Sequence, residues 1–273
     1  MTGPAPHPRI VLCLPAGGYS LAPIEIACDI ARWIGAHLET VVSAEDALDA
    51  RDIMPLAREF QPLLQRWNTG DPQTLSDRHL LQARFRREAE KVANASGVPS
   101  LFQTVSDELA VRSAELAREK DIIAFPAPRH RGEELVGSYP GLLATISSIS
   151  RPILILPQAP ARRKGPILAV LSRDDMALRH LAEQMARAAN EDLIVIAAED
   201  GSDREVLRRF PDPLGRLPLR FAGRSEMYRS TLTGLRDLGE RLVLISRQSC
   251  EDLTGTNFLG LVATRRVPLL ITT

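Results

Sequence analysis

One loop of the sequence carries residue types that bind anions. It runs from Pro126 to Gly132 and contains Arg129, His130 and Arg131. Guanidinium groups bind phosphates and carboxylates through paired hydrogen bonds, so Arg129 and Arg131 are candidate ligands for such a group. A solvated loop without a ligand is the alternative, because charged side chains are mostly exposed in any protein.

Small residues accompany this basic loop. Gly17 and Gly18 follow an apolar run and precede a helical pattern. Glycine allows a ligand to approach the main chain closely, but it equally allows a tight turn with positive φ. Ser138 follows Gly137 and is placed to cap a helix, and the same hydroxyl can contact a phosphate at the helix N-terminus.

Residue sets for catalysis are not apparent. The histidines have no H-x-x-x-H or H-E-x-x-H spacing for a metal, and neither a G-x-S-x-G elbow nor a G-x-x-x-x-G-K-[ST] loop occurs. Asp174 and Asp175 are adjacent carboxylates, which a helix cap explains more simply than catalysis does. We therefore expect a protein that is not an enzyme, although catalytic sets can also assemble from distant residues.

Composition restricts the classes of partner. Lys plus Arg and Asp plus Glu each number 34, so the formal net charge is zero and no global field attracts nucleic acid or an anionic membrane. Of the three cysteines, Cys13 and Cys28 lie in apolar patterns and are expected to be buried, and no C-x-x-C pair occurs. No secretory signal and no membrane-spanning run are recognised, so a cytoplasmic protein is expected.

The elements that position these residues form an internal repeat. Each half contains continuous apolar runs typical of strands buried on both faces, alternating with helical patterns. The strands expected in the first half are 9–14, 38–42, 101–105, 121–125 and 153–156, and those in the second half are 167–171, 193–198, 217–221, 241–245 and 269–271. Such alternation predicts parallel sheets with right-handed β-α-β crossovers.

The helices repeat as well. In the first half a helical pattern ends at Gly35, a natural helix stop, and in the second half Asp174 or Asp175 can cap the equivalent helix. Residues 157–165 join the halves and contain the basic run Arg162-Arg163-Lys164, which is either a phosphate contact or, more simply, part of a solvated hinge.

The first half carries a longer insert, residues 43–99. Its first part has an apolar stripe that predicts a helix and includes Phe60 and Trp67, although Pro55 and Pro62 fit a helix poorly. Its second part predicts another helix with Leu80, Leu81, Phe85, Val92 and Ala93 on one side. We expect Phe60 and Trp67 to pack on the first half or on another subunit, because a free apolar stripe of that size is an aggregation hazard; a partner surface or a lid is the alternative.

The order of strands and helices, its duplication and its closing pattern together resemble the universal stress protein family in its tandem form. The closing pattern is Gly255-Thr256 before the last helix and Arg266-Val267-Pro268 before the last strand. Gly137-Ser138 and Arg151-Pro152 occupy the equivalent places in the first half. The resemblance implies two five-stranded parallel-sheet α/β sandwich domains of Rossmann-like type, dimerisation and, in many members, ATP or AMP binding.

The sequence departs from the pattern of the nucleotide-binding members. Those members carry an Asp after the first strand and a G-x-x-G-x9-G-[S/T] loop after the fourth, whereas this chain has Pro15-Ala16-Gly17-Gly18 and a loop with Pro126 and Pro128. The second-half loop from Ser246 contains no Gly before Gly255. The residues that the resemblance leaves as candidates in the first half are Pro15, Gly17, Gly18, Val41, Arg129, Arg131, Gly132, Gly137 and Ser138.

The predicted organisation is therefore a first α/β domain at 1–160, with its insert, and a shorter second one at 166–273. The predicted function is a non-enzymatic stress-response or regulatory binding protein with a degenerate ATP or AMP site in the first domain and none in the second. The alternatives are a protein-interaction scaffold that uses the insert, and an enzyme of the wider nucleotide-binding α/β group. Self-association is expected through the last strand of each half or the insert. Because apolar sheet edges invite association, the strands 153–156 and 269–271 are predicted to pair within the chain.

Overall fold

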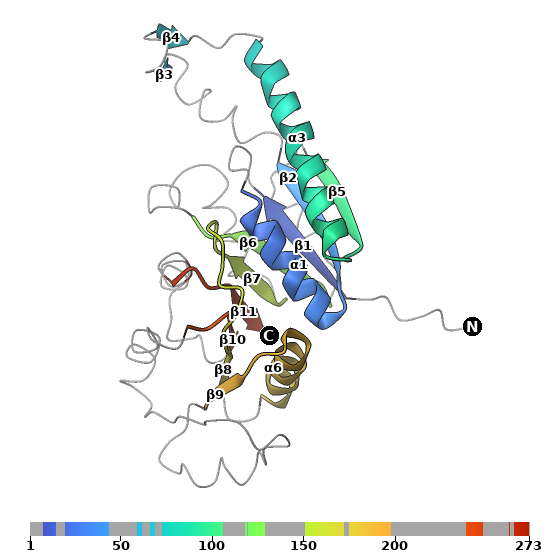
Figure 1. Ribbon diagram of the computed structural model, residues 1–273, viewed down its shortest axis with the longest axis vertical. Coiled ribbons are helices and arrows are strands. Elements are labelled where there is room, and N and C mark those ends of the chain that lie inside the picture. Colours follow the sequence, from blue (N-terminus) through green and yellow to red (C-terminus); the bar gives the residue numbers. More distant parts are fainter. Residues whose placement is uncertain are drawn as a thin grey trace, which may run out of the picture.

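The fold is an α/β sandwich built on one long sheet (Figure 1). The computed structural model describes residues 8–14, 20–43, 59–61, 66–68, 73–105, 118, 120–128, 151–171, 175–197, 239–247, 262 and 265–272. Within these residues, nine strands form a single sheet in the order β5-β2-β1-β6-β7-β11-β10-β8-β9. The predicted α/β class with a mostly parallel sheet is confirmed, and the predicted domain limits remain a prediction.

The strands of this sheet coincide with the apolar runs of the sequence. Their bounds are β1 Arg9–Leu14, β2 His37–Ser43, β5 Ser100–Val105, β6 Ile122–Pro126, β7 Ile153–Leu156, β8 Ile167–Leu171, β9 Leu193–Ala197, β10 Leu242–Ser246 and β11 Leu269–Thr272. All neighbouring strands are parallel except β7 and β11. The repeat is visible in this order, because β2-β1-β6-β7 of the first half corresponds to β9-β8-β10-β11 of the second. The strand expected at 217–221 lies outside the described residues.

The described residues include three long helices, and two of them begin and end at residues that sequence chemistry favours. Helix α1 (Ala22–Ile34) starts with Pro23 in its first turn and ends at Gly35, whose φ of 66° is the left-handed conformation that glycine adopts easily. Helix α6 (Met176–Ala189) begins at Asp175, whose carboxylate accepts a hydrogen bond from the Leu178 amide at 2.9 Å. Helix α3 (Gln73–Ala95) is the second helix predicted in the insert.

The three helices cover one face of the sheet with a core that crosses both halves. Alternate strand residues such as Ile10, Leu12 and Leu154 point to this face and cluster with the buried sides of α1, α3 and α6. The intervening residues of the first half form a second apolar cluster on the opposite face, made of Val11, Cys13, Val41, Val105 and Ile123. One continuous core therefore joins the two repeats, and both Cys13 and Cys28 are buried in it or in the opposite cluster, as predicted.

The last strands of the two halves pair with each other, as predicted from their apolar edges. Strand β11 runs antiparallel to β7, with Leu269 opposite Ile155 and Ile271 opposite Ile153. Each strand is thereby flanked on both sides, because β6 and β10 occupy their other edges. The pairing of last strands takes place within one chain, and association between chains remains untested.

The first part of the insert is not the helix that its apolar spacing predicted. Glu59–Gln61 and Arg66–Asn68 form the short strands β3 and β4, which pair antiparallel with Phe60 opposite Trp67. The physical reason lies in Pro55 and Pro62, which lack the main-chain N–H that a helix interior needs. Aromatic residues favour a paired strand, where they interact across the ladder. The surroundings of Phe60 and Trp67 lie outside what the structure describes, so their predicted packing is not tested.

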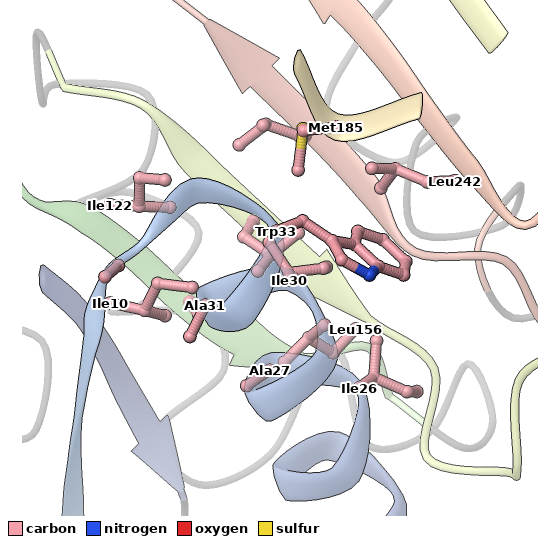
Figure 2. Close-up of a cluster of buried hydrophobic side chains, with 14 of the residues drawn as sticks. Ile10, Ile26, Ala27, Ile30, Ala31, Trp33, Ile122, Leu156, Met185 and Leu242 are labelled. Carbon is pink, nitrogen blue, oxygen red and sulfur yellow. The ribbon is translucent and has the colours of Figure 1, made fainter. Parts of the chain in front are cut away.

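Arg241 connects the two halves. Its guanidinium lies 4.5 Å from the centre of the Trp33 ring of α1 and donates to Asp29 of the same helix at 2.9 Å. It also lies 3.5 Å from Glu191, which follows α6. Figure 2 shows the Trp33 side chain among Leu156 of the first half and Met185 and Leu242 of the second. The guanidinium thus lies at the edge of the hydrophobic core that both repeats share, and it contacts residues of both halves.

Replacing Arg241 by Ala is expected to lower the free energy of unfolding by about 2–3 kcal/mol, because charge-assisted hydrogen bonds and a largely desolvated cation–π contact are lost together. Urea unfolding followed by circular dichroism measures this change. Arg32→Ala is the matched control, since Arg32 pairs with the same Asp29 at 2.7 Å but its side chain is 54% exposed, and its loss should cost less than about 1 kcal/mol. Equal losses for the two variants would show that Arg241 does not join the halves.

Candidate functional site

The candidate site lies where the strand order of the first half reverses. From β1 the chain crosses to β2 on one side, whereas β6 lies on the other side of β1, with Ile10 opposite Ile122. In open α/β sheets this reversal creates the position where ligands bind, at the carboxyl ends of the strands. The two loops singled out by sequence begin at this place, because β1 ends at Leu14 and β6 at Pro126.

Among the sequence-predicted site residues, Val41 is the one within the described part of the chain. Pro15, Gly17, Gly18, Arg129, Arg131, Gly132, Gly137 and Ser138 lie outside it. Val41 pairs with Cys13 in register, and its side chain is fully buried in the apolar cluster on the face opposite α1. Its side chain thus belongs to the hydrophobic layer beneath the carboxyl edge of the sheet, and its contact with a ligand remains a prediction.

The main chain at the end of β6 has few donors to offer. Pro126 and Pro128 have no N–H, and between them the Ala127 amide donates to the Leu156 carbonyl at 2.7 Å. The Ala127 carbonyl in turn accepts a hydrogen bond from the Gln158 side chain at 2.8 Å. A phosphate cradle needs main-chain N–H groups that point outward. Residues 126 to 128 supply none.

A polar bridge crosses the same edge of the sheet. The Ser20 hydroxyl, just before α1, donates to the Gln158 carbonyl at 2.9 Å and accepts from the Ala22 amide at 3.3 Å. Gln158 belongs to the connection between the halves and binds Ala127 after β6. This bridge, which we call the Ser20–Gln158–Ala127 bridge, therefore ties the start of α1, the connection and the end of β6 together. Sequence reasoning missed it, because nothing in the local pattern around Gln158 indicates a distant partner.

The connection that contains Gln158 is partly solvated. Arg162, Arg163 and Lys164 are exposed, as predicted, whereas Ala161 packs against the main core. Hinge motion of this connection and phosphate binding by its basic run remain predictions.

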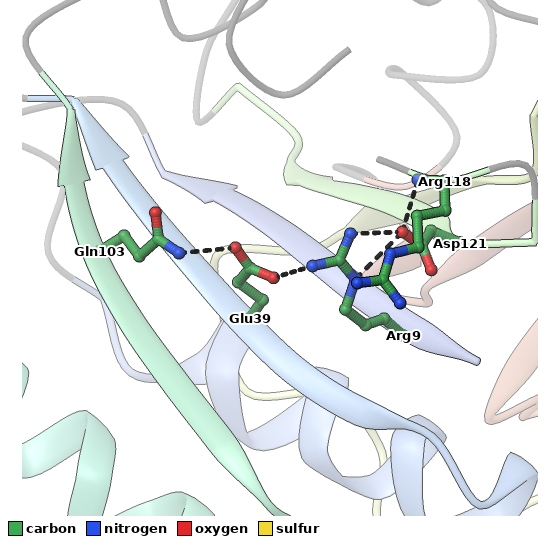
Figure 3. Close-up of polar contacts among 5 residues, drawn as sticks. All are labelled: Arg9, Glu39, Gln103, Arg118 and Asp121. Carbon is green, nitrogen blue, oxygen red and sulfur yellow. Dashed lines mark hydrogen bonds and ion pairs between the residues drawn. The ribbon is translucent and has the colours of Figure 1, made fainter. Parts of the chain in front are cut away.

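A second polar cluster, found only in the structure, is buried on the sheet face opposite α1 (Figure 3). Arg9, the first residue of β1, lies between Glu39 and Asp121, which are each 3% exposed. Its guanidinium donates to Asp121 at 2.7 and 3.0 Å and also pairs with Glu39. Gln103 donates to Glu39 at 2.9 Å, and the Arg118 amide donates to Asp121 at 2.6 Å.

The chemistry of this cluster is structural. The hydrogen bond between Arg9 and Asp121 raises the pKa of the Arg9 guanidinium above its usual value, so this group stays charged. One guanidinium thus pairs with two buried carboxylates, which would be very costly to bury without a cation.

The Cys28 thiol and the arrangement of metal-binding residue types complete the chemistry of the described residues. Burial raises the pKa of the Cys28 thiol to about 11, so it is held as the unreactive thiol. Among the described residues no group of three or more His, Cys, Asp or Glu is arranged to hold a metal ion. None of the helices in the described ranges is long and apolar enough to cross a membrane.

Comparisons with known proteins match the fold and not the sequence. No protein-family model matches the chain, and no curated protein gives a significant match. A universal stress protein from Archaeoglobus fulgidus superposes with a TM-score of 0.65 at 10% identity, covering 98% of this chain and 97% of that one. A putative universal stress protein from Pseudomonas aeruginosa gives 0.55 at 16% identity, covering 97% and 92%.

The same architecture also occurs in a transport protein. The cytoplasmic domain of a prokaryotic cation chloride cotransporter superposes with a TM-score of 0.52 at 14% identity, covering 97% of this chain and 95% of that domain. Sequence identities this low support a shared fold and do not indicate a shared function. From its strand order, its core and these superpositions, the chain has the fold of the universal stress proteins.

Proposed function

We propose that this chain is a non-enzymatic regulatory binding protein of the universal stress type, whose first-half nucleotide site is degenerate. The observation that carries the proposal is the end of β6, beside the strand-order reversal. Its Ala127 amide is engaged with Leu156, and Pro126 and Pro128 have no amide hydrogen. The place where a nucleotide phosphate would be cradled therefore has lost main-chain donors.

Residual binding would depend on the remaining candidates of the first half. Gly17, Gly18, Gly137 and Ser138 retain the flexibility and the hydroxyl of such a site, and Arg129 and Arg131 could pair with phosphate in place of the missing amides. In the second half the corresponding loop begins Ser246-Arg247 and contains no Gly before Gly255, so no site is expected there.

Calorimetric titration with ATP and with AMP tests this proposal. Each lost charge-assisted hydrogen bond costs about 1.5–3 kcal/mol, so two or three such losses turn micromolar binding into roughly millimolar binding or none. Weak binding should disappear in Gly137→Val and persist in Gly255→Val, which changes the equivalent glycine of the second half.

Two results would contradict the proposal. Micromolar affinity that Gly137→Val abolishes would mean that the first site is intact, and loss of binding in Gly255→Val would place a site in the second half. If neither nucleotide binds, the result agrees with a degenerate site, and a scaffold that uses the insert becomes the better hypothesis for what the chain does. Release of ADP, AMP or phosphate from ATP by the purified chain would favour the enzyme alternative.

A further inference from the structure

The two edges of the nine-stranded sheet differ in exposure. At one edge β9 is buried along Leu193, Ile194 and Val195. At the other edge β5 is open to solvent, with Ser100 and Thr104 exposed and Leu101 53% exposed. Native proteins commonly protect an edge strand with charges, a proline or a covering element. The six residues of β5, Ser-Leu-Phe-Gln-Thr-Val, include no charge and no proline.

The main chain of β5 points alternately toward β2 and away from it. Leu38 of β2 lies opposite Ser100 and donates to the Pro99 carbonyl at 2.9 Å. In a parallel ladder this register directs the amides and carbonyls of Leu101, Gln103 and Val105 to β2. The amides and carbonyls of Ser100, Phe102 and Thr104 therefore face outward from the sheet.

We propose that β5 pairs antiparallel with β5 of a second copy of this chain. The row of outward groups is self-complementary about a two-fold axis at Phe102, which places Ser100 opposite Thr104 of the other copy. The chain already contains one antiparallel pairing of this kind, in which β7 and β11 connect the strands of the two halves into one sheet. The dimer would repeat this antiparallel pairing at the β5 edge, where β2 is the single neighbour among the described strands.

The neighbouring side chains suit this arrangement. Phe102 is held edge-to-face against Phe85 of α3, with ring centres 6.3 Å apart, and Arg86 lies 5.7 Å above the Phe102 ring. Gln82 of α3 donates to the Thr104 hydroxyl at 3.1 Å. Helix α3 therefore fixes the position of β5 before association, so little ordering is required when the second copy arrives.

Sedimentation equilibrium of the full chain from about 1 to 200 µM tests the proposal. A small interface made of one pair of β5 strands is expected to have a dissociation constant in the micromolar range. The mass should rise from monomer to dimer across that range. Thr104→Pro removes one outward amide without touching the β2 ladder and should weaken dimerisation at least tenfold. Thr104→Val keeps the amide while losing the same hydroxyl, so it should dimerise as the unchanged chain does.

Two further variants keep the test independent of proline effects. Leu101→Lys puts a charge on the edge and should also prevent dimerisation, whereas Met176→Lys, at a position 45% exposed on α6, should not. A double variant with Ser100→Cys and Thr104→Cys should form disulfide-linked dimers under mild oxidation, and neither single variant should. A chain that stays monomeric throughout, or a dimer that Thr104→Pro and Leu101→Lys leave unchanged, overturns the proposal.

Discussion

Replacing Arg9 by Met is expected to lower the free energy of unfolding by about 3–5 kcal/mol, which is a large share of the stability of a typical domain. Arg9 is the common partner of Glu39 and Asp121, whose side chains are each 4% exposed. Its removal leaves two carboxylates buried without a cation, and the Gln103 and Arg118 donors are neutral amides. Urea unfolding of the variant beside the unchanged chain measures the loss.

Further variants distinguish two causes of this loss of stability: buried charge without a partner, and lost packing of the Arg9 side chain. If uncompensated charge is the cause, combining Arg9→Met with Glu39→Gln and Asp121→Asn should restore part of the stability, because no buried charge remains. Arg9→Lys should be intermediate, since an ammonium keeps the charge but lacks the planar fork that reaches both carboxylates. A triple variant that is no more stable than Arg9→Met would instead assign the effect to lost contacts of the Arg9 stem.

Replacing Gly165 by Ala is expected to lower the free energy of unfolding by at least about 3 kcal/mol, because steric overlap and backbone strain add. Gly165 has φ of +136°, and a Cβ there would lie 2.1 Å from the Gly239 carbonyl oxygen. That oxygen belongs to the main chain, and the adjacent Arg241 amide is held by the Pro166 carbonyl at 2.9 Å, so the segment cannot move aside easily.

Gly35→Ala separates the two contributions to the Gly165 effect. Gly35 also has positive φ, +66°, but a Cβ there would meet nothing within 4 Å. Its replacement should therefore cost only the left-handed backbone penalty, about 1–2 kcal/mol. Thermal or urea unfolding of both variants gives the comparison, and equal losses would mean that the contact between Gly165 and Gly239 is not a constraint on the fold.

Much of the architecture was predictable because it depends on local patterns. Continuous apolar runs identified the strands of the main sheet, since a parallel strand is buried on both faces wherever helices cover the sheet. Gly35 and Asp175 marked helix ends because their chemistry acts within one turn. The apolar edge of the last strand in each half was enough to predict that β7 and β11 pair.

The insert shows where local patterns are ambiguous. Phe60 and Trp67 recur at a spacing that suits a helix face, yet they lie opposite each other on β3 and β4. Short apolar runs fit either period, and the choice depends on pairing with a partner strand that the run itself does not specify. The candidate site presents the converse case: the loops at the strand-order reversal were recognisable by sequence, while the engagement of the Ala127 amide with Leu156 was not.

By itself the sequence determined the strands of the main sheet, the ends of α1 and α6, the repeat and the points where the candidate loops begin, because burial and capping act over a few residues. Only the tertiary structure decided which polar residues meet. Arg9 reaches Asp121 across 112 positions, Ser20 reaches Gln158 across 138, and Arg241 reaches Asp29 across 212. Asp121 and Arg241 occupy equivalent places in the repeat, yet one is neutralised inside the first half and the other joins the halves. Such contacts depend on strand order and register, which bring distant residues to one edge or face of the sheet and which no local period encodes.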